Sequence, residues 1–175
     1  HYRPTGGPTR PGKLVYVHGG AYVAGCAATS RRWPGEVGRR LGAEVVSIDY
    51  RLAPEHPFPA GAQDVAAVLG ALADSSEPLV VVGESAGGGV LLSALQLARA
   101  DVTVDAVVLL WPSTDLSLTQ PSLLANAGRD VLTMKAIRPA AAAYLAGQDP
   151  MDPLVSPVRA GLGWLPRTLI QVGDR

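Results

Sequence analysis

The sequence predicts an α/β protein in which helices flank a mainly parallel sheet on both faces. Apolar, β-branched runs alternate with segments whose apolar residues recur at helical spacing. The runs lie far enough apart to be joined by right-handed crossovers, which place successive strands parallel to one another. The chain has 175 residues, 47% of them hydrophobic, which is enough for one buried core.

The predicted strands are short and apolar, and they cover residues 13–17, 43–50, 79–82, 106–111 and 168–172. The predicted helices cover residues 30–41, 63–73, 88–99 and 133–145. Gly42 ends the first helix. Residues 51–59 contain three prolines and are predicted to be a loop.

From Pro112 to Gly163 the alternation of strands and helices breaks. This segment is too long for an ordinary connection between two strands. We interpret 112–163 as an excursion over the active edge of the sheet, and the whole chain, 1–175, as one partial domain.

The composition excludes several classes of partner. Fifteen basic residues balance fifteen acidic ones, so net charge does not favour nucleic acid or an anionic membrane surface. Cys26 is the only cysteine and cannot form an internal disulfide. No apolar run approaches the length of a membrane span. We expect a cytoplasmic protein, and a chain that is truncated at both ends.

The segment Gly83-Glu84-Ser85-Ala86-Gly87 lies between the strand at 79–82 and the helix at 88–99. A Gly-x-Ser-x-Gly sequence between a strand and a helix is typical of a nucleophile elbow, a tight turn that exposes the serine above the sheet. A simple glycine-rich turn is the alternative, but the strand and helix on either side favour the elbow. The sequence therefore predicts that Ser85 is a nucleophile.

A second motif, His18-Gly19-Gly20-Ala21, follows the first predicted strand. Its small residues allow the backbone to approach a substrate closely. Negative charge develops on the carbonyl oxygen when a serine attacks an ester, and preorganised N–H groups stabilise it. The N–H groups of Gly20 and Ala21, together with that of Ala86, are predicted to form this oxyanion hole.

The general base is predicted to lie outside these residues. In α/β-hydrolases the chain order is serine, acid and then histidine, whereas His1, His18 and His56 all precede Ser85. We expect His18 to hold the oxyanion loop by hydrogen bonding and His56 to pack within its loop.

Two aspartates are candidates for the acid that orients the base. Asp174 follows the last predicted strand and is the first choice, whereas Asp115 follows the preceding strand. A solvated turn carboxylate is the alternative role for each of them. The acid can also lie beyond Arg175.

Four motifs together resemble the hormone-sensitive-lipase-like family of α/β-hydrolase carboxylesterases: His18–Tyr22, Tyr50–Ala60, Gly83–Gly88 and Asp152–Pro157. The resemblance covers Leu14 to Asp174. It implies a truncated α/β-hydrolase fold and a serine hydrolase that cleaves carboxylic esters with short to medium acyl chains. It also implies that neither a metal nor an organic cofactor is needed.

The sequence departs from the family pattern at two positions and in extent. Ala21 replaces a third glycine, which is tolerated unless the position needs a positive φ. Glu84 replaces an aspartate and is expected to support the loop. Family members also have an N-terminal cap and a C-terminal part that carries the histidine, and they often pair through their last strand. We therefore expect these 175 residues alone to be a poor or inactive catalyst.

The sequence thus predicts a serine carboxylesterase with a small-molecule ester as substrate. A non-catalytic small-molecule receptor on the same scaffold is the first alternative, because plant gibberellin receptors resemble this family and have lost the histidine. An amide or lactone hydrolase is the second, because it would use the same residues.

Overall fold

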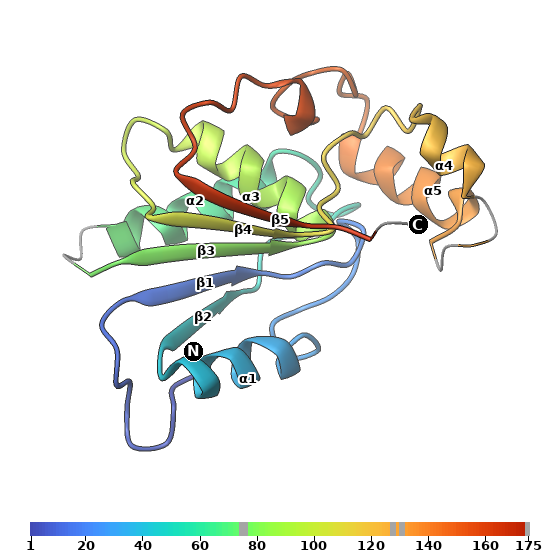
Figure 1. Ribbon diagram of the computed structural model, residues 1–175. Coiled ribbons are helices and arrows are strands. Elements are labelled where there is room, and N and C mark those ends of the chain that lie inside the picture. Colours follow the sequence, from blue (N-terminus) through green and yellow to red (C-terminus); the bar gives the residue numbers. More distant parts are fainter. Residues whose placement is uncertain (74–76, 127–128, 130–131, 174–175) are drawn as a thin grey trace.

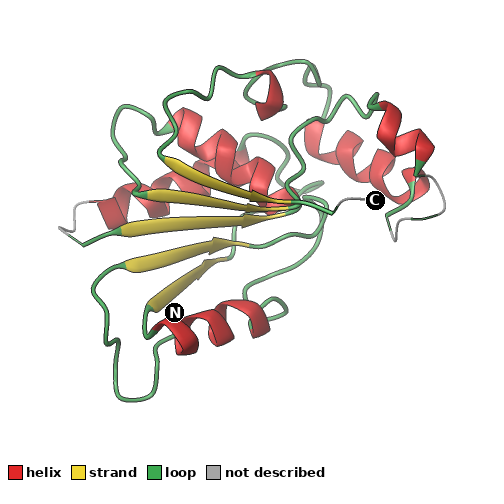
Figure 2. Cartoon of the chain, in the orientation of Figure 1, coloured by secondary structure: helices red, strands yellow, loops and turns green. Residues whose placement is uncertain are grey.

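The computed structural model describes residues 1–73, 77–126, 129 and 132–173, and these residues form an α/β fold (Figures 1 and 2). Their strands are β1 (Lys13–Val17), β2 (Glu44–Ile48), β3 (Leu79–Glu84), β4 (Ala106–Leu110) and β5 (Arg167–Gln171). Their helices are α1 (Arg32–Leu41), α2 (Ala60–Ala73), α3 (Ala86–Leu97), α4 (Pro121–Ala125) and α5 (Met134–Leu145), with a 3-10 turn, η1, at Pro157–Arg159.

The strands form one parallel sheet in the order β2-β1-β3-β4-β5. At its carboxyl edge, Val17 of β1 is in register with Gly83 of β3, and Glu84 of β3 is in register with Leu110 of β4. Because every strand points the same way, the residues that follow β1, β3 and β4 gather at this edge (Figure 1). The predicted fold class, a parallel sheet with flanking helices, is confirmed.

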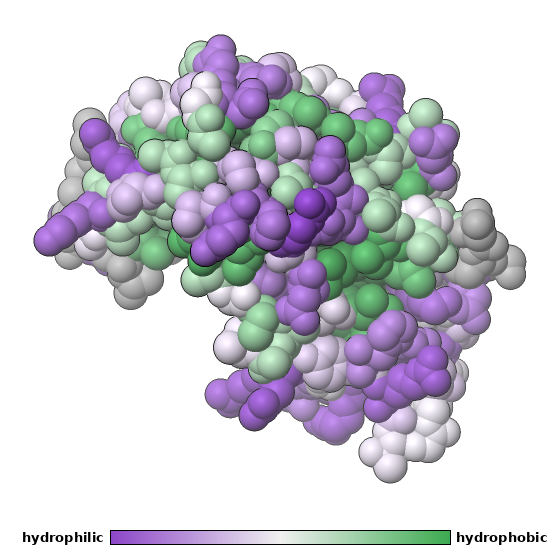
Figure 3. Space-filling model, turned by 180° about the vertical axis from the view of Figure 1, so that it is seen from behind, coloured by the Kyte–Doolittle hydropathy of each residue, from purple (hydrophilic) through white to green (hydrophobic). Residues whose placement is uncertain are grey.

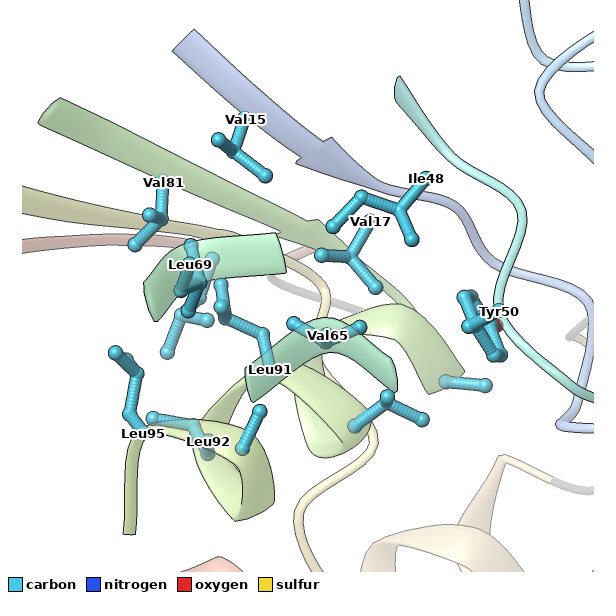
Figure 4. Packing of buried hydrophobic residues seen from close by; sticks show 14 of the residues in the cluster. Val15, Val17, Ile48, Tyr50, Val65, Leu69, Val81, Leu91, Leu92 and Leu95 are labelled. Carbon is cyan, nitrogen blue, oxygen red and sulfur yellow. The ribbon is translucent and has the colours of Figure 1, made fainter. Parts of the chain in front are cut away.

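Helices cover both faces of the sheet, with α1 on one face and α2 and α3 on the other (Figure 1). The larger core lies between the sheet and the α2–α3 pair, where Val15 and Val81 of the sheet face Leu69 of α2 and Leu91 of α3 (Figure 4). Helix α3 is buried along almost its whole length, which explains its uniformly apolar sequence. Burial of these side chains fixes the helix that begins directly after Ser85.

The elements differ from the sequence prediction mainly at the starts of two helices and in one additional helix, while the other ends agree to within about two residues. Helix α2 begins at Ala60 and not at residue 63, because the carbonyl of Pro59 accepts the N–H of Gln63 at 3.0 Å and so closes a first turn before residue 63. Helix α3 begins at Ala86, immediately after the elbow. The short helix α4 was not predicted, and it begins with Pro121, a residue favoured at a first helical position.

Helices α4 and α5 lie beyond the carboxyl ends of the strands (Figure 1). No helix among the described residues is both long and apolar enough to cross a membrane.

Seen from behind, the lower part of the molecule, where α1 lies, is mostly hydrophilic (Figure 3).

A substitution at Gly87 tests how closely the first turn of α3 packs on β1. A Cβ atom at Gly87 would lie 2.3 Å from the carbonyl oxygens of Val17 and His18, so we expect Gly87→Ala to lower the free energy of unfolding by about 3 kcal/mol. Gly70→Ala is the matched control, because nothing lies within 4 Å of a Cβ atom at this position in α2. It should raise the free energy of unfolding by about 1 kcal/mol. Urea unfolding of the intact protein measures both, and equal effects would contradict this packing.

Candidate active site

Ser85 lies in a strained turn between β3 and α3. Its backbone has φ 52° and ψ −121°, a conformation that costs a non-glycine residue about 1–3 kcal/mol. Three backbone hydrogen bonds hold it: the Ser85 N–H donates to the carbonyl of Leu110 at 2.9 Å, and the Ser85 carbonyl accepts from Gly88 at 3.0 Å and from Ser113 at 2.9 Å. The neighbouring backbone therefore fixes the direction of the serine.

The glycines of the elbow are required by space. A Cβ atom at Gly83 would lie 2.6 Å from the Cα atom of Gly88. A Cβ atom at Gly88 would lie 2.7 Å from the Cβ atom of Pro112, which follows β4. Since real Cβ atoms do not approach other atoms so closely, any side chain at these positions would push the elbow apart.

The loop after β1 has an unusual backbone at three consecutive residues. Gly20, Ala21 and Tyr22 have φ values of 131°, 53° and 69°. Only glycine fits at the first of them, because a Cβ atom at Gly20 would lie 1.9 Å from the carbonyl oxygen of Ala24. Ala21 stands where the resemblance implied a third glycine, and its φ is positive, so the alanine carries a strain of about 1 kcal/mol.

His18 supports this loop from within the core. Its side chain is only 1% exposed, and its ring stacks on Tyr50 with centroids 4.5 Å apart. The Nδ1 atom lies 2.7 Å from the carbonyl oxygen of Gly19, and the Tyr50 hydroxyl donates to the carbonyl of His18 at 2.8 Å. These contacts anchor the start of the loop to the segment that follows β2.

The other two histidines lie elsewhere. His1 has its Nδ1 atom 2.9 Å from a carboxylate oxygen of Glu44, the first residue of β2, which lies at the edge of the sheet opposite the elbow. His56 is exposed in the loop before α2. Within the described part of the chain, no three His, Cys, Asp or Glu side chains gather in a way that could hold a metal ion.

Glu84, the residue before the serine, is held by β1. The Tyr16 hydroxyl donates a hydrogen bond to the carboxylate of Glu84. Burial, and then this hydrogen bond to an acidic group, raise the pKa of the Tyr16 hydroxyl. A Cβ atom at Gly19 would lie 3.2 Å from both the carbonyl oxygen of Glu84 and the Cβ atom of Ser85. The loop after β1 and the elbow are thus in direct contact.

A cleft of about 600 Å³ opens over the elbow. Its lining consists of Gly19, Gly20, Ser30, Glu84, Ser85, Trp111, Leu132 and Gly173. The structure therefore brings Ser85, Glu84 and two residues of the predicted oxyanion loop to one cavity. Sequence analysis did not assign Trp111 to the site. It is half exposed with φ 38°, and its signal was an aromatic residue at the carboxyl end of a predicted strand.

The two candidate acids differ in what the structure shows. Asp174 lies outside the described residues, although the preceding Gly173 lines the cleft. Asp115 pairs with the guanidinium of Arg159 at 3.1 Å and accepts the N–H of Ser117 at 2.9 Å. Burial alone would raise the pKa of Asp115, but the hydrogen bonds from Ser117 and the positive charge of Arg159 outweigh burial and lower it. Asp115 thus ties the segment after β4 to η1.

Known proteins are similar to this chain in sequence and in fold. A family model described as alpha/beta hydrolase fold matches residues 14–175. The crystal structure of an esterase from the bacterial hormone-sensitive lipase family superposes with a TM-score of 0.85 at 40% identity, over 93% of this chain and 57% of that one. The chain belongs to the hormone-sensitive-lipase-like family of α/β-hydrolases.

Two curated relatives of this hormone-sensitive-lipase-like chain are similar over most of its length. An acetyl-hydrolase of Streptomyces hygroscopicus is 38% identical over 167 residues, which are 92% of this chain and 56% of the relative. Carboxylesterase NlhH of Mycobacterium tuberculosis is 37% identical over 178 residues, which are 92% of this chain and 55% of the relative. The chain spans about half the length of these relatives, and its family is one of carboxylic ester hydrolases.

Asp115→Asn tests whether Asp115 is a structural residue of this family member. We expect it to lower the free energy of unfolding by about 1 kcal/mol at pH 7 and to leave ester hydrolysis nearly unchanged. Because the folded-state pKa lies below the ordinary value of 3.8, the stabilisation is complete above that value and is lost as pH falls through the folded-state pKa.

Urea unfolding of the intact protein from pH 7 downwards measures this difference, which should vanish in acid. A thousand-fold loss of activity at unchanged stability would instead identify Asp115 as the acid that orients the base.

Proposed function

We propose that this chain carries the nucleophile and the oxyanion hole of a serine carboxylesterase that hydrolyses short- to medium-chain carboxylic esters. The observation that carries the proposal is the strained backbone of Ser85 at a cleft that Gly19 and Gly20 also line. The names of the two relatives, an acetyl-hydrolase and a carboxylesterase, support this substrate class.

The reaction begins when Ser85 Oγ attacks the ester carbonyl carbon and passes its proton to a general base. The carbonyl oxygen becomes an oxyanion, which the backbone N–H groups of Gly20, Ala21 and Ala86 stabilise. Ala86 is the first residue of α3, so its N–H has no partner within the helix and lies at the positive end of the helix dipole. When the intermediate collapses, the base returns the proton to the leaving oxygen, so that the alcohol departs and acyl-Ser85 remains. The base then accepts a proton from water, which hydrolyses acyl-Ser85 to the carboxylic acid and free Ser85.

The base and its orienting acid complete the proposal. Each of the three histidines precedes Ser85, and none lines the cleft. We therefore assign the base to a histidine outside these 175 residues, and the orienting role to Asp174, which follows Gly173 at the cleft. The 175 residues alone are then a poor or inactive catalyst. The segment 112–163 covers the active edge in this proposal.

Ser85→Ala should abolish hydrolysis of p-nitrophenyl butanoate by the intact protein, since it removes the hydroxyl that attacks the ester. The expected loss of kcat is about 10⁴-fold or more, with the fold preserved because the backbone turn is unchanged. Ser122→Ala, an exposed position on α4, is the control and should keep full activity. Wild-type turnover by Ser85→Ala would refute the assignment.

A fluorophosphonate probe separates the esterase from the receptor alternative. An activated serine forms a covalent adduct, and mass spectrometry should locate it on Ser85 of the intact protein. A protein that binds small esters but gives neither adduct nor turnover would instead be a receptor. Parallel assays with amide and lactone substrates separate the remaining hydrolases.

A further inference from the structure

The mechanism above leaves one buried aromatic side chain of the oxyanion loop without a role. Tyr22 follows Ala21 directly, and its own backbone is left-handed, with φ 69°. Its side chain is only 4% exposed, so it lies inside the protein and not in the cleft. Two consecutive non-glycine residues with positive φ persist only where the surrounding structure enforces them.

Tyr22 is connected to several parts of the active edge. Its hydroxyl donates to the carbonyl of Ser113 at 3.2 Å, and the N–H of Ser113 donates to the carbonyl of Ser85 at 2.9 Å. Its carbonyl accepts the N–H of Ala53 at 3.0 Å. Its hydroxyl also packs against the first turns of α3: a Cβ atom added at Gly89 would lie only 2.6 Å from the hydroxyl oxygen. These contacts fix both ends of the tyrosine.

The face of the Tyr22 ring is held by α5. The ring of Tyr144 stacks on it with centroids 4.1 Å apart and planes at 22°. Phe58 contacts the Tyr144 ring edge-on at 5.7 Å, and its N–H donates to the carbonyl of Tyr144 at 2.9 Å. Offset-stacked and edge-on pairs are the favoured arrangements of aromatic rings. The three rings thus form one cluster behind the oxyanion loop.

The surroundings of the Tyr144 hydroxyl indicate that the ring, and not the hydroxyl, stabilises Tyr22. It is buried and has no hydrogen-bond partner among the described residues. Burying an unpartnered hydroxyl is unfavourable, so the hydroxyl does not explain this position. What the side chain provides is the flat surface against Tyr22.

We propose that Tyr144 is a positioning residue for the oxyanion hole. Its ring prevents Tyr22 from turning away, and the fixed Tyr22 keeps Gly20 and Ala21 in the conformation that aims their N–H groups at the cleft. The inference rests on the proposed esterase function, since it assigns a role only to a hole that stabilises an oxyanion. It makes α5 a part of the catalytic apparatus without contact to the substrate.

The test compares Tyr144→Leu, which removes the ring, with Tyr144→Phe, which keeps the ring and removes the unpartnered hydroxyl. In the intact protein, Tyr144→Leu should lower kcat for p-nitrophenyl butanoate about tenfold to a hundredfold with KM within about twofold, because misplaced donors weaken binding of the transition state more than of the ester. Tyr144→Phe should keep kcat within about twofold of the wild type. A boronic acid, which mimics the tetrahedral intermediate, should lose affinity for Tyr144→Leu in proportion to kcat/KM.

Leu69→Ala controls for loss of stability, because Leu69 is fully buried in α2 and does not take part in the aromatic cluster. It should lower the melting temperature at least as much as Tyr144→Leu and leave kcat unchanged well below that temperature. If Tyr144→Leu does not fold, Phe58→Leu replaces it, since this change removes only the edge-on contact, and a smaller fall in kcat is then expected.

Wild-type kcat in Tyr144→Leu, or in Phe58→Leu where that variant replaces it, overturns the inference. So does an equal loss of kcat in Tyr144→Phe. The Ser85→Ala result separates this failure from failure of the proposed function: if Ser85 proves essential while the Tyr144 variants keep wild-type kcat, the esterase stands and only the role of Tyr144 falls. If the intact wild type hydrolyses no ester, both fall together.

Discussion

The close approach of backbone to backbone at the elbow is the constraint on which the rest of the active edge depends. Gly87, in the first turn of α3, packs against the carbonyl groups of Val17 and His18, where β1 ends. This contact limits how closely α3 can approach the sheet and thereby helps to hold Ser85 in its strained conformation with positive φ. The loop that begins at His18 starts from the same point, so Ser85, the proposed nucleophile, and the proposed oxyanion donors are positioned by the same contact.

The strand order explains which strands position the backbone on either side of Ser85. Strand β3 carries the elbow, and it lies between β1 and β4. On one side β1 leads into the glycine-rich loop. On the other side the carbonyl of Leu110, at the end of β4, accepts the Ser85 N–H, and the N–H of Ser113 returns a hydrogen bond to the Ser85 carbonyl. A strained serine is thus flanked on both sides by ordered backbone, and the buried helix α3 offsets the strain.

Local patterns in the sequence predicted the strands and the elbow. The features that the sequence did not predict depend on contacts between residues far apart in the chain. The strands follow from β-branched runs, and the elbow follows from glycines whose spacing has a steric cause at Gly83 and Gly87. The stacking of Tyr22 on Tyr144 joins residues that are far apart in the chain, so no local pattern could reveal it. The conformation of Ala21 could not be predicted either, because alanine rarely adopts the positive φ that this loop imposes.

Ala21 shows how strain and preorganisation are linked in this loop. A glycine there would adopt the left-handed conformation without strain, but many other backbone conformations would also be accessible to it. An alanine has fewer alternatives and is strained by about 1 kcal/mol, so the loop needs support from outside itself. Hydrogen bonds at both ends of Tyr22, together with the aromatic rings behind it, are such a support. In the proposed oxyanion hole, donors held in advance need no reorganisation when charge develops on the substrate, and the backbone strain is the cost of holding them there.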